Sequence, residues 1–388
     1  MTSFDELLSR AVSDVVPKKL AEEKLKSGKP LRIYLGIDPT GAKLHLGHSV
    51  PLRKMRAFQD AGHHVILLIG SFTAMIGDPT GRDEMRQALT ADDVKKNFET
   101  YIEQAKLILD MKKLEIRYND EWLSKVGFAE IAKLASHFTK QQMEERDMFK
   151  DRESRGEPIH LQEFLYPLMV GYDSVMLDVD CELGGNDQLF NMLAGRTLQK
   201  AYGKREKFVL TTKLIEGTDG RKMSKTYNNC VYLTDTPDEM YGRILSMPDN
   251  LIPLYMECCT GLPMTEVKAA EKALKDGKEN PKNLKMRLAR EIVTMYHSAA
   301  AAKDAEAAFE NVFKNKGVPD DMLEYKAKKG ESLIDALLAS GTVTSKSEAR
   351  RLIEQGGVKV NDVVVKSIDA KAEKGVVKVG KRKFLKIC

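Results

Sequence analysis

The sequence predicts an α/β protein in three parts: a parallel-sheet domain, an all-helical domain and a small α+β domain. Three observations support this. Two apolar strand patterns flank a helix pattern within the first 70 residues, a helical repeat dominates after Thr236, and a capped helix followed by a hairpin pattern begins at Ser345. The chain has 388 residues, of which 42% are hydrophobic and 31% charged. That length and composition fit two or three folded domains.

The strand patterns of the first domain alternate with helix patterns. Leu31–Ile37 and Val65–Gly70 are apolar runs bounded by turn residues, and Ser49–Ala61 between them has helical spacing. A strand, a helix and a strand within about 40 residues predict a βαβ unit and a parallel sheet. Later strands are expected at Ser174–Val179 and Lys207–Leu210.

Two further amphipathic segments, Asp92–Met111 and Phe128–Gln142, predict helices. They place a mostly helical insertion at about 83–160 inside an α/β domain that covers 1–232. From 233 to 325 the apolar positions recur at helical spacing, as in Leu284 and Leu288, so we expect an all-helical domain that ends in a linker at Asn315–Lys329.

The last part, 331–388, has its own local signals. Ser345 and Glu348 match a capping box that begins a helix reaching Gln355, and Gly356 follows as a stop signal. Two short valine-rich runs then alternate across Asn361, which predicts a hairpin.

Charge and cysteine content limit the partners. The net charge is +5, and 331–388 alone holds 12 Lys and Arg against 7 Asp and Glu. Such a basic domain is equally consistent with nucleic-acid binding and with a solvated surface. Five cysteines without a CxxC pair predict neither a disulfide framework nor a metal site. We expect a cytoplasmic protein with no signal peptide and no membrane span, since no apolar run approaches 18 residues.

The stretch from Tyr34 to His48 joins a predicted strand to a predicted helix. It contains the sequence His45-Leu-Gly-His, with Gly47 lacking a side chain. A helix N-terminus after a buried strand suits a phosphate, and Gly47 lets a flat base approach the backbone. Taken alone, this pattern is equally consistent with nucleotidyl transfer and with a histidine pair of another kind.

A second stretch, Glu216–Lys225, contains Lys222-Met-Ser-Lys225 after two glycines. The glycines allow a mobile loop, and its lysines could close over phosphates. Taken alone, such a run is more often a solvated basic loop.

Together the two motifs resemble the paired HxGH and KMSK signatures of class I aminoacyl-tRNA synthetases. Several surrounding segments are similar to the bacterial-type tyrosyl branch of that family: Asp38–Gly41, Gly77–Arg82, Tyr166, Tyr172-Asp173 and Glu182–Gln188. The tail, through Ser345–Asn361, is similar to an S4-type RNA-binding domain. The resemblance spans nearly the whole chain. It implies a Rossmann-like catalytic domain, a helical anticodon-binding domain and an S4-like C-terminal domain.

The resemblance also implies a two-step ligation. L-Tyrosine is activated with ATP to tyrosyl-adenylate and pyrophosphate, and the tyrosyl group then passes to the 3′ end of tRNA(Tyr). Mg²⁺ would accompany ATP, and positioning and charge stabilisation would supply most of the catalysis. A homodimer is also implied, with the insertion at its interface.

Site residues are carried over by matching motifs. Catalytic roles fall on Thr40, His45, His48, Lys222, Lys225, Arg82 and Arg86. ATP-binding roles fall on Asp38, Gly47, Gly185, Asp187, Met223 and Ser224. Tyrosine-binding roles fall on Tyr34, Asp78, Tyr166, Asp173 and Gln188, of which Tyr34 and Asp173 pair with the phenol. The tRNA-binding roles fall on Lys346, Arg350 and Arg351.

One position departs from the family pattern. Four residues after Tyr166 the family commonly has glutamine, which helps to bind the substrate amino group, and here the residue is Val170. Recognition of that group then falls on Asp78, Tyr166 and Gln188.

Three alternatives remain open. A tryptophanyl-tRNA synthetase is disfavoured by Tyr34, Asp173 and the tail, and another nucleotidyltransferase leaves the helical domain and tail unexplained. An RNA-binding or chaperone protein derived from a synthetase is favoured only by Val170. The intact histidine and lysine motifs disfavour it.

Overall fold

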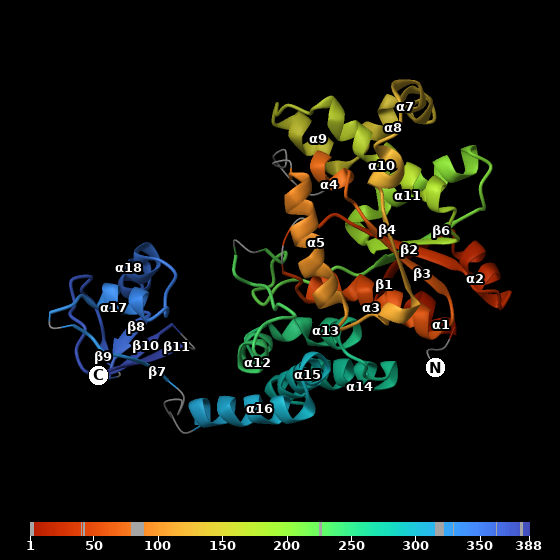
Figure 1. The fold of residues 1–388 in the computed structure, drawn as a ribbon. Helices are drawn as coiled ribbons and strands as arrows, with labels where there is room; N and C mark the ends of the chain where they lie inside the picture. Colours follow the sequence, from red (N-terminus) through yellow and green to blue (C-terminus); the bar gives the residue numbers. More distant parts are fainter. Residues whose placement is uncertain are drawn as a thin grey trace. The chain divides into compact units, whose positions relative to one another are not determined.

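The structure is a computed structural model of the 388-residue chain. It describes residues 4–39, 41, 43–78, 89–224, 227–314, 322–328, 330–361, 363–380 and 383–388. The chain forms two compact units, Met1–Ala302 and Lys303–Cys388 (Figure 1). Within the described residues, no helix is both long and apolar enough to cross a membrane.

The described part of the first unit is built on a six-stranded sheet in the order β1-β6-β5-β2-β3-β4. Its strands are β1 Val12–Val16, β2 Arg32–Ile37, β3 His64–Ile69, β4 Leu114–Tyr118, β5 Cys181–Gly185 and β6 Phe208–Thr212. All neighbouring pairs are parallel except β1 and β6. This is the α/β fold that the strand and helix patterns predict.

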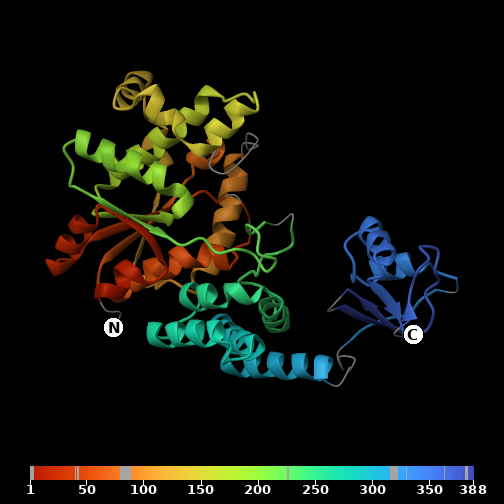
Figure 2. The ribbon, with the colours of Figure 1, turned by 180° about the vertical axis from the view of Figure 1, so that it is seen from behind.

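Helices cover both faces of this sheet, as the two opposite views show (Figures 1 and 2). Helix α3 (Leu46–Asp60) packs on one face, and α10 (Leu161–Leu177) and α11 (Leu189–Ala201) lie on the other. Coverage on both faces explains why the strands are continuous apolar runs instead of alternating patterns: five of the six residues of β3 are buried.

The order of the strands opens a crevice at the carboxyl ends of β2 and β5. From β2 the chain crosses through α3 to β3, and from β5 it crosses through α11 to β6 on the other side. The two crossovers run in opposite directions from adjacent strands. Ligands bind at such a switch point in open α/β sheets.

Two expectations about this unit are wrong. The predicted strand at Ser174–Val179 is mostly helical, because α10 continues to Leu177 and ends where Asp178 adopts a left-handed conformation with φ 47°. The strand that follows is β5. A short apolar run does not distinguish a buried strand from a buried helix. The predicted helix at Phe128–Gln142 is two helices, since Thr139 caps a new one.

The segment predicted as a mostly helical insertion also holds β4, which pairs with β3 at the edge of the sheet. The other helices that precede α10 in the first unit are short or lie at its periphery. They are α1 Phe4–Ser9, α2 Lys18–Lys26, α4 Thr73–Ile76, α5 Ala91–Ala105, α6 Asp120–Leu123, α7 Phe128–Ala135, α8 Lys140–Glu144 and α9 Asp147–Ser154.

After the sheet, the chain is helical where helical spacing predicts it. The helices are α12 Pro237–Leu245, α13 Ile252–Cys259, α14 Met264–Lys275, α15 Pro281–Tyr296 and α16 Ala299–Lys314, the last continuing into the second unit. Thr236 caps α12 by accepting from the Glu239 backbone N–H. Leu284, Leu288 and Ile292 form the buried stripe of α15.

After the end of α16, the second unit contains a five-stranded sheet and two further helices among its described residues. The elements are β7 Leu323–Tyr325, α17 Leu333–Ala339, α18 Lys346–Glu354, β8 Val358–Val360, β9 Val363–Val364, β10 Gly375–Val379 and β11 Lys383–Ile387. Half of the predicted capping box is present: Ser345 Oγ accepts from the Glu348 N–H at 3.1 Å, whereas the Glu348 carboxylate accepts from the Thr344 N–H at 2.7 Å. The predicted hairpin joins β8 to β9. Of the predicted linker, 315–321 lies outside the described residues, while β7 is a strand paired with β11.

Candidate active site

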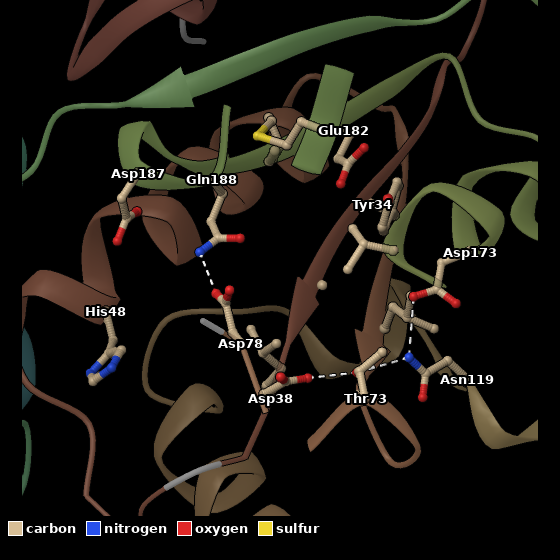
Figure 3. Close-up of a pocket in the computed structure, with 18 of the residues that line it drawn as sticks. Tyr34, Asp38, His48, Thr73, Asp78, Asn119, Asp173, Glu182, Asp187 and Gln188 are labelled. Atoms are coloured by element: carbon tan, nitrogen blue, oxygen red, sulfur yellow. Dashed lines mark hydrogen bonds between the residues drawn. The ribbon is translucent and has the colours of Figure 1, made fainter. Parts of the chain in front are cut away.

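A cavity of about 400 Å³ opens at the carboxyl ends of β2 and β5 (Figure 3). Side chains from β2, β5, α10 and the chain after β3 line it. Tyr34, Gly36 and Asp38 share one face of the backbone because side chains alternate along a strand. Gly36 is exposed on the cavity floor, and a side chain there would occupy the cavity. The floor is therefore open between Tyr34 and Asp38.

The closed end of the cavity holds a tyrosine and a buried carboxyl group. Tyr34 is 1% exposed and Asp173 3% exposed. Asp173 accepts from Trp122 Nε1 at 2.7 Å and from Asn119 Nδ2 at 3.1 Å. Burial raises the pKa of the Asp173 carboxyl well above its usual range, while the two donated hydrogen bonds favour its ionised form. Burial also raises the pKa of Tyr34, which keeps its proton.

A chain of hydrogen bonds links the two ends of the cavity wall. Asp38 accepts from Thr73 Oγ1 at 2.7 Å and from Tyr166 Oη at 2.9 Å. Thr73 Oγ1 in turn accepts from Asn119 Nδ2 at 3.0 Å. Figure 3 shows this connection from Asp38 through Thr73 to Asn119 and Asp173. The shared partners fix Asp38 and Asp173 relative to each other.

Asp78, which lies beside Asp38 in Figure 3, and Gln188 meet at the cavity. Gln188 Nε2 donates to an Asp78 carboxylate oxygen at 2.8 Å (Figure 3). Val170 of α10 also lines the cavity and offers no polar atom beyond its backbone. Among the residues lining the cavity, acidic side chains outnumber basic ones, so the cavity favours a ligand that carries an ammonium group.

The HxGH motif stands at the N-terminus of α3. His45 is the N-cap, and its backbone N–H donates to His48 Nδ1 at 3.2 Å. The two rings lie 3.8 Å apart. Burial and the neighbouring ring lower the pKa of His45 to about 3, and burial lowers that of His48 to about 4, although water reaches the open face of His48. Both imidazoles are therefore neutral near pH 7.

The loop that carries Lys222, Met223 and Ser224 lies beside this helix end. A Cβ on Gly47 would stand 2.9 Å from the His45 ring and 3.2 Å from the Met223 sulfur. The loop is held by Asn229, whose side chain accepts from Ser224 N–H at 2.8 Å and donates to the Lys222 carbonyl at 3.0 Å. The structure thus brings the two motifs together, 175 residues apart in sequence.

Asp187 follows β5 and faces the same cavity (Figure 3). Burial raises its pKa, and the positive charge of Lys222 acts in the opposite direction. A Cβ on Gly185 would stand 2.7 Å from an Asp187 carboxylate oxygen, so glycine lets that side chain stand close to the backbone.

Eight predicted site residues of the first unit line this cavity: Tyr34, Asp38, His48, Asp78, Tyr166, Asp173, Asp187 and Gln188. Six others are described but do not line it: His45, Gly47, Gly185, Lys222, Met223 and Ser224. Thr40, Arg82, Arg86 and Lys225 lie outside the described residues. Lys346, Arg350 and Arg351 lie on α18 of the second unit. Lys346 pairs with Asp335 at 2.7 Å, and a separate cavity of about 190 Å³ is lined by Lys346 and Arg350.

Sequence reasoning missed the residues that hold the site in place. Asn119 and Trp122 follow β4, inside a segment interpreted as helical insertion, and Thr73 follows β3. Polar residues at the carboxyl ends of parallel strands were the available signal. Asn229 carried no signal, because its role depends on the fold of the loop.

Comparisons with known proteins agree with this geometry. Residues 26–314 match the family of class I tRNA synthetases for tryptophan and tyrosine, and residues 333–377 match the S4 domain. The chain is 47% identical to a tyrosine–tRNA ligase of Carboxydothermus hydrogenoformans, covering 98% of this chain and 97% of that protein. It is 45% identical to the tyrosine–tRNA ligase of Thermotoga maritima, covering 98% and 96%.

Solved structures share the fold at lower identity. The tyrosyl-tRNA synthetase of Archaeoglobus fulgidus, solved with L-tyrosine, superimposes with a TM-score of 0.63 at 20% identity, covering 78% of this chain and 98% of that one. A C-terminally truncated mitochondrial tyrosyl-tRNA synthetase of Aspergillus nidulans gives a TM-score of 0.64 at 24% identity, covering 80% and 92%.

A parallel sheet with HxGH at a helix N-terminus, a KMSK loop beside it and a matching family model define a class I aminoacyl-tRNA synthetase, an enzyme that uses ATP as substrate. Within that class, this chain belongs to the bacterial-type tyrosine–tRNA ligase family.

Proposed function

We propose that the cavity activates L-tyrosine with ATP and that the enzyme then transfers the tyrosyl group to the 3′ end of tRNA(Tyr). One observation carries the proposal: the phenol-binding pair, Tyr34 and Asp173, closes one end of a cavity that His48 and Asp187 border at the other. An aromatic amino acid with a hydroxyl group fits between them.

Tyrosine would bind with its phenol at the closed end. Asp173 accepts a hydrogen bond from the phenol hydroxyl, and hydrogen bonds from Trp122 and Asn119 fix the position of the Asp173 carboxyl group. The ammonium group faces Asp78, Tyr166 and Gln188, the acidic side of the cavity. A hydroxyl-binding site rejects phenylalanine because its buried polar groups then lack partners; tyrosyl-tRNA synthetases are the standard example, with about 10⁵-fold discrimination.

ATP would place its phosphates at the N-terminus of α3. Free backbone N–H groups and the helix dipole attract negative charge there, and neutral imidazoles add donors. A tyrosine carboxylate oxygen attacks the α-phosphorus as its bond to the pyrophosphate oxygen breaks. Lys222 would stabilise the departing pyrophosphate. The resemblance assigns the same kind of role to Thr40, Lys225, Arg82 and Arg86.

The nucleoside would lie near Gly47, Met223 and Ser224, with the ribose at Gly185 and Asp187. Mg²⁺ would enter bound to the ATP phosphates, because the described residues contain no group of three His, Cys, Asp or Glu side chains that could hold a metal. Mg²⁺ commonly binds through substrate phosphates with few protein ligands, and it would neutralise charge on them.

The helical segment 233–325 and the S4-like segment 331–388 would bind the tRNA, the first at the anticodon and the second through Lys346, Arg350 and Arg351. A homodimer would form through 83–160, the segment in which Phe128 is 85% exposed. Five free cysteines fit a reducing cytoplasm.

The test is amino-acid-dependent exchange of labelled pyrophosphate into ATP, with tyrosine, phenylalanine and tryptophan in parallel. Exchange with tyrosine alone supports the proposal, and exchange with tryptophan would indicate the other branch of the family. A well-folded protein that binds RNA but exchanges with none of the three would overturn the enzymatic role.

A further inference from the structure

A buried polar cluster lies behind the phenol end of the cavity, and the reaction described above does not use it. It consists of Ser174 from α10, Glu182 from β5 and Lys207 just before β6. Lys207 is 1% exposed and Glu182 4% exposed. Burying an ion pair is costly, and apolar residues of similar volume commonly stabilise a fold as well or better. The position of this pair against Tyr34 therefore suggests a role in the site.

The cluster contacts the phenol-binding tyrosine directly. Lys207 Nζ donates to Ser174 Oγ at 2.6 Å and to a Glu182 carboxylate oxygen. Ser174 Oγ lies 2.9 Å from Tyr34 Oη, where either hydroxyl can be the donor, and it can also donate to the Glu182 carboxylate oxygen at 3.3 Å. The Lys207 ammonium also stands 5.7 Å from the centre of the Tyr34 ring. Figure 3 shows Glu182 and Tyr34 side by side at this end of the cavity.

Helix α11 leaves space for the cluster at Gly195. A Cβ on this residue would stand 2.4 Å from Ser174 Oγ, 2.5 Å from Lys207 Nζ and 3.1 Å from the Glu182 oxygen. Glycine is unfavourable inside a helix, so the helix gives up stability where the three polar groups meet.

The donor and acceptor capacities of these groups limit the possible directions of their hydrogen bonds. An ammonium only donates and a carboxylate only accepts, whereas a hydroxyl has one proton to give. Lys207 donates to Ser174 and to Glu182, so it competes with Ser174 for the Glu182 carboxylate oxygen. Tyr34 Oη is the nearer acceptor for the Ser174 proton, at 2.9 Å against 3.3 Å for the Glu182 oxygen. When Ser174 donates to Tyr34, Tyr34 can direct its own proton into the cavity.

We propose that Lys207 is a positioning residue that sets the direction of this hydrogen-bond chain, so that Tyr34 donates to the phenol oxygen of bound tyrosine while Asp173 accepts the phenol proton. This inference rests on the proposed function, since it concerns the same substrate. It predicts that changes in the cluster alter recognition of the phenol hydroxyl group and do not alter binding of the other parts of the tyrosine molecule.

The test compares kcat/KM for tyrosine and for phenylalanine at high concentration in pyrophosphate exchange. Ser174→Ala removes the middle of the chain and keeps the Lys207–Glu182 pair. We expect kcat/KM for tyrosine to fall about tenfold, the effect of one hydrogen bond, with the value for phenylalanine unchanged. The matched control is Leu210→Ala, an equally buried residue of β6 that does not line the cavity; it should lower the melting temperature and leave the ratio of the two values unchanged.

Two more variants distinguish an effect on the direction of the hydrogen bonds from an effect on side-chain packing. Lys207→Met leaves Glu182 to capture the Ser174 proton, so the tyrosine-to-phenylalanine ratio should fall further than in Ser174→Ala. Adding Glu182→Met should restore part of the ratio, whereas a packing role predicts that the double variant is no better than the single one. If the lysine variants do not fold, the ratio of the two kcat/KM values in Ser174→Ala is the test of the proposal.

The proposal is overturned if Ser174→Ala lowers both kcat/KM values by the same factor or changes neither. A wild-type enzyme without tyrosine-dependent exchange would instead contradict the proposed function, so the two failures are distinguishable.

Discussion

Val170 stands on the cavity wall at a position where the resemblance leads one to expect glutamine, and Asp78, Tyr166 and Gln188 line the same cavity. We propose that these three residues bind the substrate ammonium group. Of these, Gln188 already donates to Asp78 and Tyr166 already donates to Asp38. These contacts hold the oxygens in place before the substrate arrives, but the side chain at 170 adds no acceptor.

Val170→Gln should therefore improve tyrosine binding. A new carboxamide oxygen accepting from the ammonium group is expected to lower the KM for tyrosine about tenfold to a hundredfold, the range for one hydrogen bond to a charged group. The measurement is the KM for tyrosine in pyrophosphate exchange, with Val170→Leu as a control of similar polarity to valine. A KM that stays the same or rises in the glutamine variant would place the ammonium group elsewhere in the cavity.

The two histidines of the HxGH motif give a second prediction, on pH dependence. Their pKa values are lowered to about 3 and about 4, so the neutral form exists in the folded enzyme from pH 7 down to those values. The profile of kcat/KM for ATP reports groups of the free enzyme, and it should show no histidine ionisation near pH 6.5. A loss of activity with a midpoint near 6.5 that disappears in His45→Asn would contradict this.

At the residue scale, the sequence singled out residues that line the cavity better than the residues that support them. His48 and Asp173, which line the cavity, were singled out because they stand in motifs of recognisable spacing. Asn119, which joins Asp173 to Thr73, could not be found, because the strand before it was hidden in a segment interpreted as helical. Lys207 was seen only as the start of a strand, since a buried ion pair is formed by residues distant in sequence.

At the scale of elements, α10 and α11 pack closely on one face of the sheet, and their contact depends on Gly171. A Cβ there would stand 2.7 Å from Leu198 Cδ1 and 3.3 Å from the Ala194 backbone. The leucine can move, but the backbone has little freedom in a close-packed helix pair.

Gly171→Ala should lower the free energy of unfolding. Overpacking costs roughly 1–3 kcal/mol, and alanine returns about 1 kcal/mol of helix propensity, so the net loss should be about 1 kcal/mol. Thermal or urea unfolding measures it. Combining the change with Leu198→Ala should cost less than the sum of the two single variants, because the smaller side chain makes room. Additive losses would show that Leu198 is not the group under strain.

The same helix shows why one element was predicted wrongly. Ser174 to Val179 is short, apolar and rich in β-branched residues at its ends, which favours a strand. Its place at the end of a 17-residue helix is decided by packing against α11. In contrast, β2, α3 and β3 were predicted because turn residues bound them, and the cap at Ser345 was predicted because it depends on neighbours in sequence.

At the scale of the whole molecule, the chain forms two compact units. The cavity proposed for both reactions lies in the first unit. The cations of α18 lie in the second, where Lys346 and Arg350 border a small cavity with Asp335 and Asp369.

Replacing Lys346, Arg350 and Arg351 with alanine should separate the two steps. Lost phosphate contacts are expected to lower kcat/KM for tRNA aminoacylation about tenfold at moderate salt and to weaken its salt dependence. Tyrosine-dependent pyrophosphate exchange should not change. The control removes three cations from the sheet of the same unit: Lys359, Lys378 and Lys386. Equal losses in both variants would indicate a general charge effect and no specific role for α18.

Strand β2 and the residue that follows it border the cavity at two points: Tyr34 of the strand at the closed end, and Asp38, one residue beyond the strand and past the open position at Gly36. A strand has a fixed rise of about 3.3 Å per residue. The backbone therefore sets the distance between these two positions, and with it the length of the substrate that fits between them. Substitutions at the rim of the cavity can change which ring fits, but they do not change this distance. Redesign towards a longer amino acid would have to relocate one end onto a different strand.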